Sequence, residues 1–170
     1  PLSADVSDAA QTPSAVWLAT PRGIGRFDGA AWRTYDARDG LPDAPANALA
    51  AAGEIVYAAT DAGIARFDGA APDGRWQMVS DAPARDLAIA PDGDLWATDG
   101  LAVALVGEDT ASALPLPTAV RGLAATNDAV WLATPDGVLR YDGHWTVFTA
   151  ADGLPGLDVT AIGAAADGHV

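Results

Sequence analysis

A sequence motif that recurs about every forty residues constrains the fold of this chain more than any other feature. It reads VWLATPRGIGRFDG at 16–29, VYAATDAGIARFDG at 56–69 and VWLATPDGVLRYDG at 130–143. Alignment on its aromatic residue makes Trp17, Tyr57, Trp96 and Trp131 equivalent, at spacings of 40, 39 and 35 residues. A repeat of this length is one supersecondary unit that buries its apolar faces against neighbouring copies.

The interior of each repeat predicts four short strands. Gly, Pro or Asp interrupts the chain every several residues, which leaves no room for the helices of a paired-helix array. In the second repeat we expect strands at 46–52, 54–60, 63–68 and 75–79. Four antiparallel strands per forty residues predict an all-β fold, a β-propeller with four-stranded blades.

The repeat also predicts the domain organisation. Residues 1–15 form an N-terminal segment that supplies the first strand of blade one, and 159–170 begin a further blade. The blades between them are expected at 16–45, 46–83, 84–118 and 119–158. The third is irregular, with a loop over 110–118 in place of a short fourth strand. We expect the chain to be part of a larger ring of about six to eight blades, the alternative being a small ring closed by a swapped terminal strand.

The regularly spaced aromatic residues have a structural interpretation. One set lies on the second strand of each repeat and the other on the third, so both are expected to fill the space between successive blades rather than hold a ligand. These residues are Trp17, Tyr57, Trp96 and Trp131, and Phe27, Phe67 and Tyr141.

Charge excludes several classes of partner. The chain has 23 acidic and 9 basic residues, all of them Arg, for a net charge of −14. A field of this sign repels phosphate backbones and anionic lipids, so we expect no nucleic acid partner. No apolar run approaches the roughly 18–20 residues of a membrane span, so we expect no direct membrane insertion.

Catalytic and metal-binding patterns are sparse. The chain has no Cys and two His, His144 and His169, both in expected turns. No phosphate-binding loop, zinc motif or calcium loop is present, so we expect no catalytic residue, metal or cofactor. Three arginines, Arg26, Arg66 and Arg140, each precede an Asp by two residues, which indicates a structural pair on one strand face.

The expected strand order predicts a ligand-binding face. The turns between second and third strands and the connections between blades emerge at the same end of each sheet, where propellers commonly bind ligands. The charged residues expected there are Arg22, Arg38, Asp39, Asp61, Asp136 and Asp152.

These motifs resemble the two-component regulator propeller repeat. Its pattern is a strand ending in Trp-aliphatic-small-Thr, then Gly-aliphatic, an Arg-Tyr-Asp-like turn, an aromatic strand and Gly-Leu-Pro. The first and fourth repeats match throughout, including Asp-Gly-Leu-Pro at 39–42 and 152–155, whereas the second lacks Gly-Leu-Pro and the third keeps only LWAT at 95–98. The resemblance implies a bacterial extracytoplasmic sensor of a membrane-bound hybrid histidine kinase.

Three functions are therefore considered. The resemblance favours a non-catalytic sensor or interaction platform, periplasmic or extracellular, whose partner is a small molecule or glycan, or another protein domain. The alternatives are a secreted propeller enzyme, such as a polysaccharide or antibiotic lyase, and a structural protein-binding ring. Fold alone does not decide between them.

Overall fold

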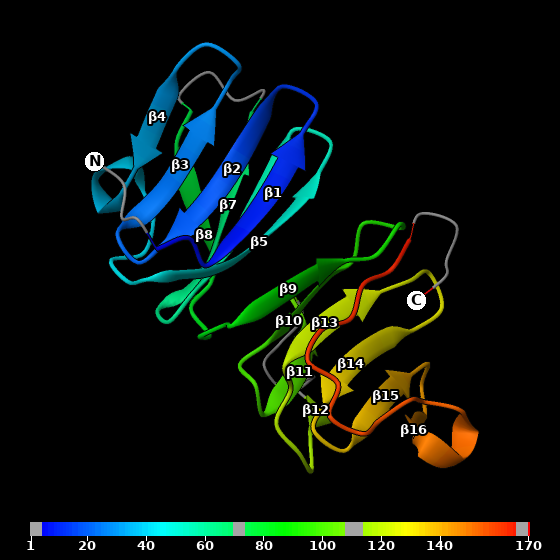
Figure 1. Ribbon diagram of the computed structural model, residues 1–170. Coiled ribbons are helices and arrows are strands. Elements are labelled where there is room, and N and C mark those ends of the chain that lie inside the picture. Colours follow the sequence, from blue (N-terminus) through cyan, green and yellow to red (C-terminus); the bar gives the residue numbers. More distant parts are fainter. Residues whose placement is uncertain (1–4, 70–73, 108–113, 166–169) are drawn as a thin grey trace. The chain divides into compact units, whose positions relative to one another are not determined.

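The computed structural model describes residues 5–69, 74–107, 114–165 and 170. These residues divide into two compact units, Pro1–Leu87 and Ala88–Val170, which are described separately. Figure 1 shows that the chain is built from strands. The described residues also include two single 3-10 turns, at Ala37–Asp39 and Ala150–Asp152. The all-β prediction is confirmed.

The first unit contains two four-stranded sheets, which we call blade one and blade two. Each is an antiparallel meander in which every strand pairs with the next one along the chain. Blade one consists of β1 (Asp8–Thr12), β2 (Ala15–Thr20), β3 (Gly23–Phe27) and β4 (Trp32–Tyr35), and blade two of β5 (Ala46–Ala52), β6 (Ile55–Thr60), β7 (Gly63–Asp68) and β8 (Trp76–Ser80). The strands predicted for the second repeat agree with β5–β8 to within one residue at each end.

The second unit contains blade three and blade four, with the same order of strands. Blade three consists of β9 (Asp86–Ile89), whose first two residues belong to the first unit, with β10 (Leu95–Thr98), β11 (Ala102–Leu105) and β12 (Leu114–Pro115). Blade four consists of β13 (Gly122–Ala125), β14 (Val130–Thr134), β15 (Gly137–Tyr141) and β16 (Trp145–Phe148).

Blade three differs from the prediction of a loop in place of its fourth strand. Leu114 and Pro115 pair with Val103 and Ala102 of β11, so a short fourth strand exists. Proline has no N–H to donate to a ladder, and the sequence has Pro at 115 and 117, which limits this strand to two residues. Residues 110–113 of the expected loop lie outside the described residues, and 116–118 follow the strand without belonging to it.

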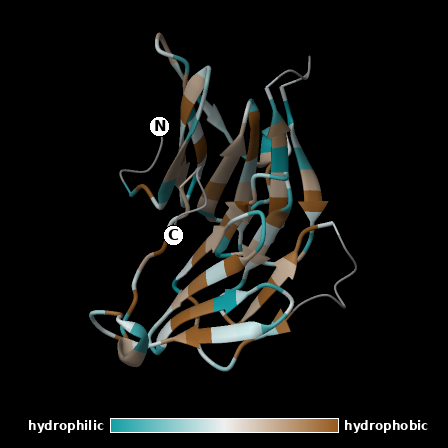
Figure 2. Ribbon diagram, turned by 90° about the vertical axis from the view of Figure 1, so that its right-hand side faces the viewer, coloured by the Kyte–Doolittle hydropathy of each residue, from teal (hydrophilic) through white to brown (hydrophobic). Residues whose placement is uncertain are grey.

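Each unit has its own apolar core. In the first unit, Trp17 is 1% exposed, and its ring centroid lies 5.0 Å from that of Phe67 and 5.9 Å from that of Trp76, both in blade two. In the second unit, Val103 of blade three shares a core with Leu132 of blade four. Apolar and polar residues are interleaved along the strands, as Figure 2 shows, because successive side chains point to opposite faces of a sheet.

One turn is built identically in three blades. The Thr that ends the second strand, at positions 20, 60 and 134, donates its hydroxyl to the carbonyl of the Gly that begins the third strand. The hydroxyl also accepts a hydrogen bond from the backbone N–H two residues on. In blade two that Gly, Gly63, has φ +130°, and a Cβ there would lie 2.4 Å from the Ser80 carbonyl oxygen, so only Gly fits.

Candidate functional site

The first unit carries a cavity of about 230 Å³ at the end of the sheets where β2 turns into β3. Its walls come from three segments: the β2–β3 turn of blade one, the connection from β4 to β5, and the last residue of β6. The lining residues are Pro21, Arg22, Gly23, Asp36, Ala37, Leu41, Pro42, Asp43, Ala44, Pro45, Ala46 and Thr60. The predicted convergence of these two kinds of loop at one end is therefore confirmed for blade one.

A single 3-10 turn, η1 (Ala37–Asp39), fixes the connection on one side of the cavity. Asp36 caps its first residues by accepting from the Arg38 backbone N–H, and the Asp39 carboxylate accepts from the Asp36 backbone N–H. Gly40 ends the turn with φ +96°. This reciprocal capping satisfies N–H groups that a helix start leaves without partners.

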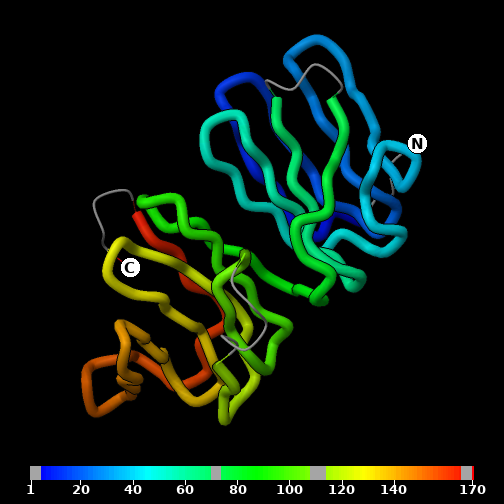
Figure 3. Tube along the Cα trace, turned by 180° about the vertical axis from the view of Figure 1, so that it is seen from behind, coloured from blue at the N-terminus to red at the C-terminus, as the bar shows by residue number. Residues whose placement is uncertain are grey.

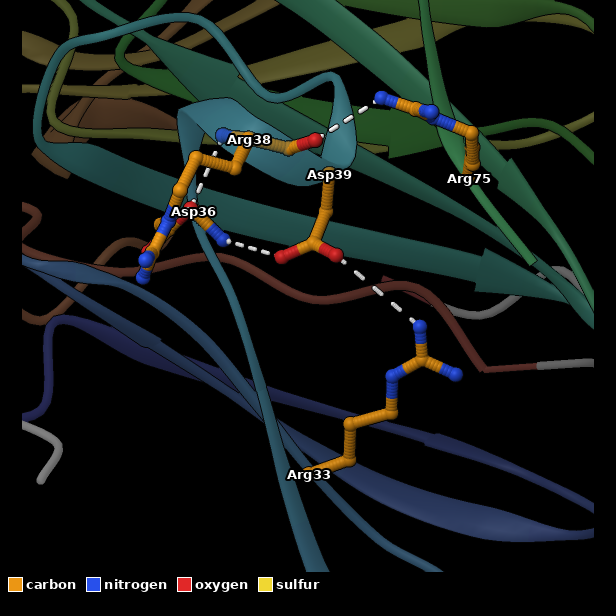
Figure 4. A network of polar contacts seen from close by, with 5 residues as sticks. All are labelled: Arg33, Asp36, Arg38, Asp39 and Arg75. Carbon is orange, nitrogen blue, oxygen red and sulfur yellow. Dashed lines mark hydrogen bonds and ion pairs between the residues drawn. The ribbon is translucent and has the colours of Figure 1, made fainter. Parts of the chain in front are cut away.

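Charged side chains around η1 form a network, shown in Figure 4. The Arg38 guanidinium donates to the Asp36 carboxylate at 2.5 Å, and Arg33 lies 4.0 Å from Asp39. Arg75 of the neighbouring blade donates to the Arg38 carbonyl at 2.8 Å. The side-chain hydrogen bond from Arg38 lowers the pKa of Asp36 to about 2 and raises that of Arg38 itself. Asp36 is therefore ionised at neutral pH.

Arg22 differs from these arginines. Its backbone N–H donates to Thr20, which fixes the turn, while its side chain is exposed at the rim of the cavity. Among the residues that the structure describes, its guanidinium has no ion pair. A cation of this kind is available to an anionic group of a ligand.

The other predicted ligand-binding residues all have partners within the fold. Asp61 accepts from Asn47, and Asp136 accepts from Thr118. Asp152 caps the blade four counterpart of η1, η3 (Ala150–Asp152), by accepting from the Thr149 backbone N–H. Of the six residues, only Arg22 lines the cavity in the first unit. Ligand binding by these residues stays a prediction.

The predicted interblade aromatic residues fall into two groups. Trp17 and Phe67 are buried and lie in one core. The others are half-buried: Tyr57, Trp96, Trp131, Phe27 and Tyr141. Trp96 packs against the core of the second unit, and Trp131 stacks on Phe148 at a centroid distance of 5.7 Å.

The repeated arginines pair with the Asp two residues ahead, as predicted. Arg66 lies 2.9 Å from Asp68, Arg26 lies 3.9 Å from Asp28, and Arg140 bonds Asp142. Arg26 and Arg140 also lie over the rings of the tryptophans on the adjacent strand, at 5.6 and 5.5 Å from the ring centroids. These charges are used within the blades.

The second unit has an acidic hollow of about 170 Å³ that includes Asp92, Asp94, Asp128 and Asp142. Two of these carboxylates, Asp128 and Asp142, bond Arg140. Within the described ranges, no group of three or more His, Cys, Asp or Glu side chains is arranged to hold a metal ion. His144 lies exposed between β15 and β16, and His169 lies outside those ranges.

Two kinds of residue around the turns were missed by sequence reasoning. The recurring Thr of each β2–β3-type turn is part of the repeated phrase, so its recurrence was the available signal. Asp36 stands three residues before Asp39, which is the spacing of a capping pair.

Neither a protein-family model nor a curated protein sequence matches the chain. Solved structures do share its fold. One is the extracellular domain of the one component system BT4673 from B. thetaiotaomicron, at a TM-score of 0.77 and 15% identity, over 96% of this chain and 25% of that one. Another is the extracellular domain of the hybrid two component system BT3049 from the same organism. Its TM-score is 0.53 and its sequence identity 15%, over 90% of this chain and 29% of that one.

A further structure with this fold is YCF48 bound to D1 peptide, with a TM-score of 0.58 and 17% identity, over 83% of this chain and 51% of that one. The chain thus spans about a quarter to a half of these three structures. The four-stranded antiparallel sheets and these likenesses confirm the prediction of propeller blades. No helix in the described part of the chain is long and apolar enough to cross a bilayer.

Proposed function

We propose that this chain is part of the extracytoplasmic sensor of a bacterial signal-transduction protein, and that it binds a small ligand without converting it. The observation that carries the proposal is the cavity beside Arg22, an exposed cation with no ion pair among the described residues. The cavity is slightly smaller than a typical pocket for a drug-sized molecule, so it suits one ring or one end of a longer ligand.

The charge of the chain favours an anionic group in that ligand. With a net charge of −14, most of the surface repels anions, and Arg22 offers a local exception. Pro21, Leu41 and Pro42 add apolar surface beside it. A sugar acid combines a carboxylate for Arg22 with a ring face for the prolines, so we propose an acidic glycan fragment as the ligand.

Likeness of fold supports the sensor assignment. Two of the structures that share the fold are extracellular domains of one- or two-component systems. Because this chain spans 25% and 29% of these extracellular domains, further propeller repeats in the parent protein are part of the proposal. The resemblance to the two-component regulator propeller repeat adds a kinase module, a membrane anchor and a location outside the cytoplasm to the proposal.

The state of the acidic residues supports binding without turnover. A general acid must hold a proton near neutral pH, whereas the pKa of Asp36 is about 2 because Arg38 donates to it. The Asp39 carboxylate caps η1. Two carboxylates line the cavity, those of Asp36 and Asp43, and the first of them is occupied in capping the turn and pairing with Arg38.

Calorimetric titration with neutral oligosaccharides, uronic acid oligosaccharides and short acidic peptides tests the proposal. We expect saturable binding of the uronic acid oligosaccharides, loss of binding in Arg22→Asp, and no loss in Arg85→Asp. Arg85 is exposed and does not line the cavity, so it controls for the change in charge. The Arg22→Asp turn reads Thr-Pro-Asp-Gly, which blade four already contains at 134–137, so the fold should tolerate it.

Two outcomes contradict this assignment. Conversion of the oligosaccharides, detected as new reducing ends or unsaturated products, would establish the lyase alternative. Binding of peptides alone, with equal affinity in both variants, would favour a protein-binding ring.

A further inference from the structure

Blade four has an apolar face that resembles a covered face of blade one. In blade one, Trp17, Ile24 and Tyr35 lie on one face, and in blade four the equivalent positions are Trp131, Val138 and Phe148. The strand registers establish the equivalence: Ile24 pairs with Tyr35 just as Val138 pairs with Phe148. We call the second set the Trp131 face.

Blade two covers the face of blade one. Trp17, Ile24 and Tyr35 are at most 1% exposed, in one core with Val56, Ala58, Phe67 and Trp76 of β6–β8. The Trp131 face instead borders a hollow of about 440 Å³, and both Trp131 and Phe148 are half-buried. Within the described residues, nothing takes the place that β6–β8 take on blade one.

One part of a covering sheet is already present. Residues 159–165, coloured red, run beside β13 in Figures 1 and 3. The Val159 N–H donates to the Thr134 carbonyl, and a Cβ on Gly122 would lie 3.4 Å from the Ile162 nitrogen. Gly122 is equivalent to Asp8 of blade one, because Gly122 pairs with Ala133 as Asp8 pairs with Ala19. In blade one, β5 lies beside this position, since the Asp8 carboxylate accepts from the Leu49 N–H. Residues 159–165 therefore take the position of β5.

Two glycines mark where the remaining strands belong. Gly40 and Gly153 end equivalent 3-10 turns, with φ +96° and +101°. A Cβ on Gly40 would lie 2.2 Å from the carbonyl oxygen of Trp76 in β8, whereas a Cβ on Gly153 would meet no atom within 4 Å. The blade four turn thus has the conformation needed beside a fourth strand, with open space in that strand's place.

We propose that the Trp131 face receives three antiparallel strands of a further repeat, of the β6–β8 kind, which complete residues 159–165 into a blade. The facing residues of these strands would be small or aliphatic near Trp131, as Val56 and Ala58 are near Trp17, and aromatic toward the fourth strand, as Phe67 and Trp76 are. Continuity with the observed interface between blades one and two supports this occupant.

A second copy of the chain fits less well. The outer face of blade one does show a matching row, Val16, Phe27 and Trp32, with Val16 39% and Trp32 53% exposed. If blade one of a second copy packed on the Trp131 face, its first strand, β1, would need the position that residues 159–165 already occupy. A partner with three strands avoids this overlap.

The test extends the chain with its own strands. Val170 aligns with Val56 in the repeat, so residues 57–83 are appended directly after Val170. We expect a monomer in which the amides of β14 exchange hydrogen about tenfold more slowly than in the parent chain. An appended copy that carries Ala58→Asp is the matched control, and it should leave exchange at the parent rate.

A second variant separates face-to-face docking from general stabilisation. In the parent chain, Gly153→Ala costs only the strain of its φ of +101°, because the Cβ meets no atom within 4 Å. In the extended chain the same Cβ would also meet the added fourth strand, so the substitution should abolish the slower exchange there. Unchanged β14 exchange in the extended chain would overturn the proposal. So would a concentration-dependent dimer of the parent chain that slows exchange at the same amides, which would identify a second copy as the occupant.

Discussion

Replacing Thr60 by Val tests the account of the repeated turn. Thr60 is 1% exposed, its hydroxyl donates to the Gly63 carbonyl at 2.7 Å, and it accepts from the Ala62 N–H at 3.1 Å. Valine has nearly the same shape without the hydroxyl, so the change removes two hydrogen bonds and creates no cavity.

The expected loss follows from those two bonds. A neutral hydrogen bond contributes about 0.5–1.5 kcal/mol net, and the loss is greater where a buried group has no replacement partner. Two bonds amount to about 1–3 kcal/mol, and burying one more methyl group offsets up to about 0.8 kcal/mol. We therefore expect Thr60→Val to lower the free energy of unfolding of the first unit by about 1–2 kcal/mol.

Urea denaturation measures this loss as a lower midpoint with an unchanged slope. The control is Thr34→Val, the same chemical change at an exposed position of β4, which should shift stability by no more than about 0.5 kcal/mol. If Thr60→Val matches the control or raises stability, the hydroxyl does not hold the turn and the reasoning is refuted.

Three further predictions address the first unit. Gly63→Ala should lower the free energy of unfolding by more than about 2 kcal/mol, because its Cβ would lie 2.4 Å from a β8 carbonyl oxygen. Gly53→Ala, in open space at φ +57°, should lower it by about 1 kcal/mol in the same urea assay. The pKa of Asp36 falls from 3.8 to about 2 on folding, so its contribution to stability is present above about pH 4 and lost as the pH falls toward 2; Asp36→Asn should flatten that part of the pH dependence of the urea midpoint. Trp17→Ala should cost about 3–5 kcal/mol, and Trp145→Ala, at 38% exposure, no more than about 1 kcal/mol, in thermal unfolding.

The strands were predictable because the repeat multiplies a weak local signal. The segment ANALAAA at 46–52 has low intrinsic β propensity, and its assignment depended on its place in the repeat. The same logic failed at 114–115, where the repeat is degenerate and a two-residue pairing leaves almost no pattern to read.

The candidate site was less predictable, because charge alone does not show which side chains are already paired. Asp39 and Asp152 belong to similar Asp-Gly-Leu-Pro motifs and were expected on the ligand face. Both carboxylates cap a 3-10 turn. The sequence contains the spacing of those caps, but the competition between capping and ligand binding is decided only by the backbone geometry.

The turns between second and third strands show where specificity can reside. Their Thr and Gly are fixed by the internal bonds and close contacts of the turn, so only the two residues between them are free to differ. These residues are Pro21-Arg22 in blade one, Asp61-Ala62 in blade two and Pro135-Asp136 in blade four. Arg22 therefore occupies a position that carries Ala and Asp elsewhere, without altering the turn. With this arrangement, a substitution at one position of the turn in each blade changes the charge presented to a ligand and costs the fold little stability.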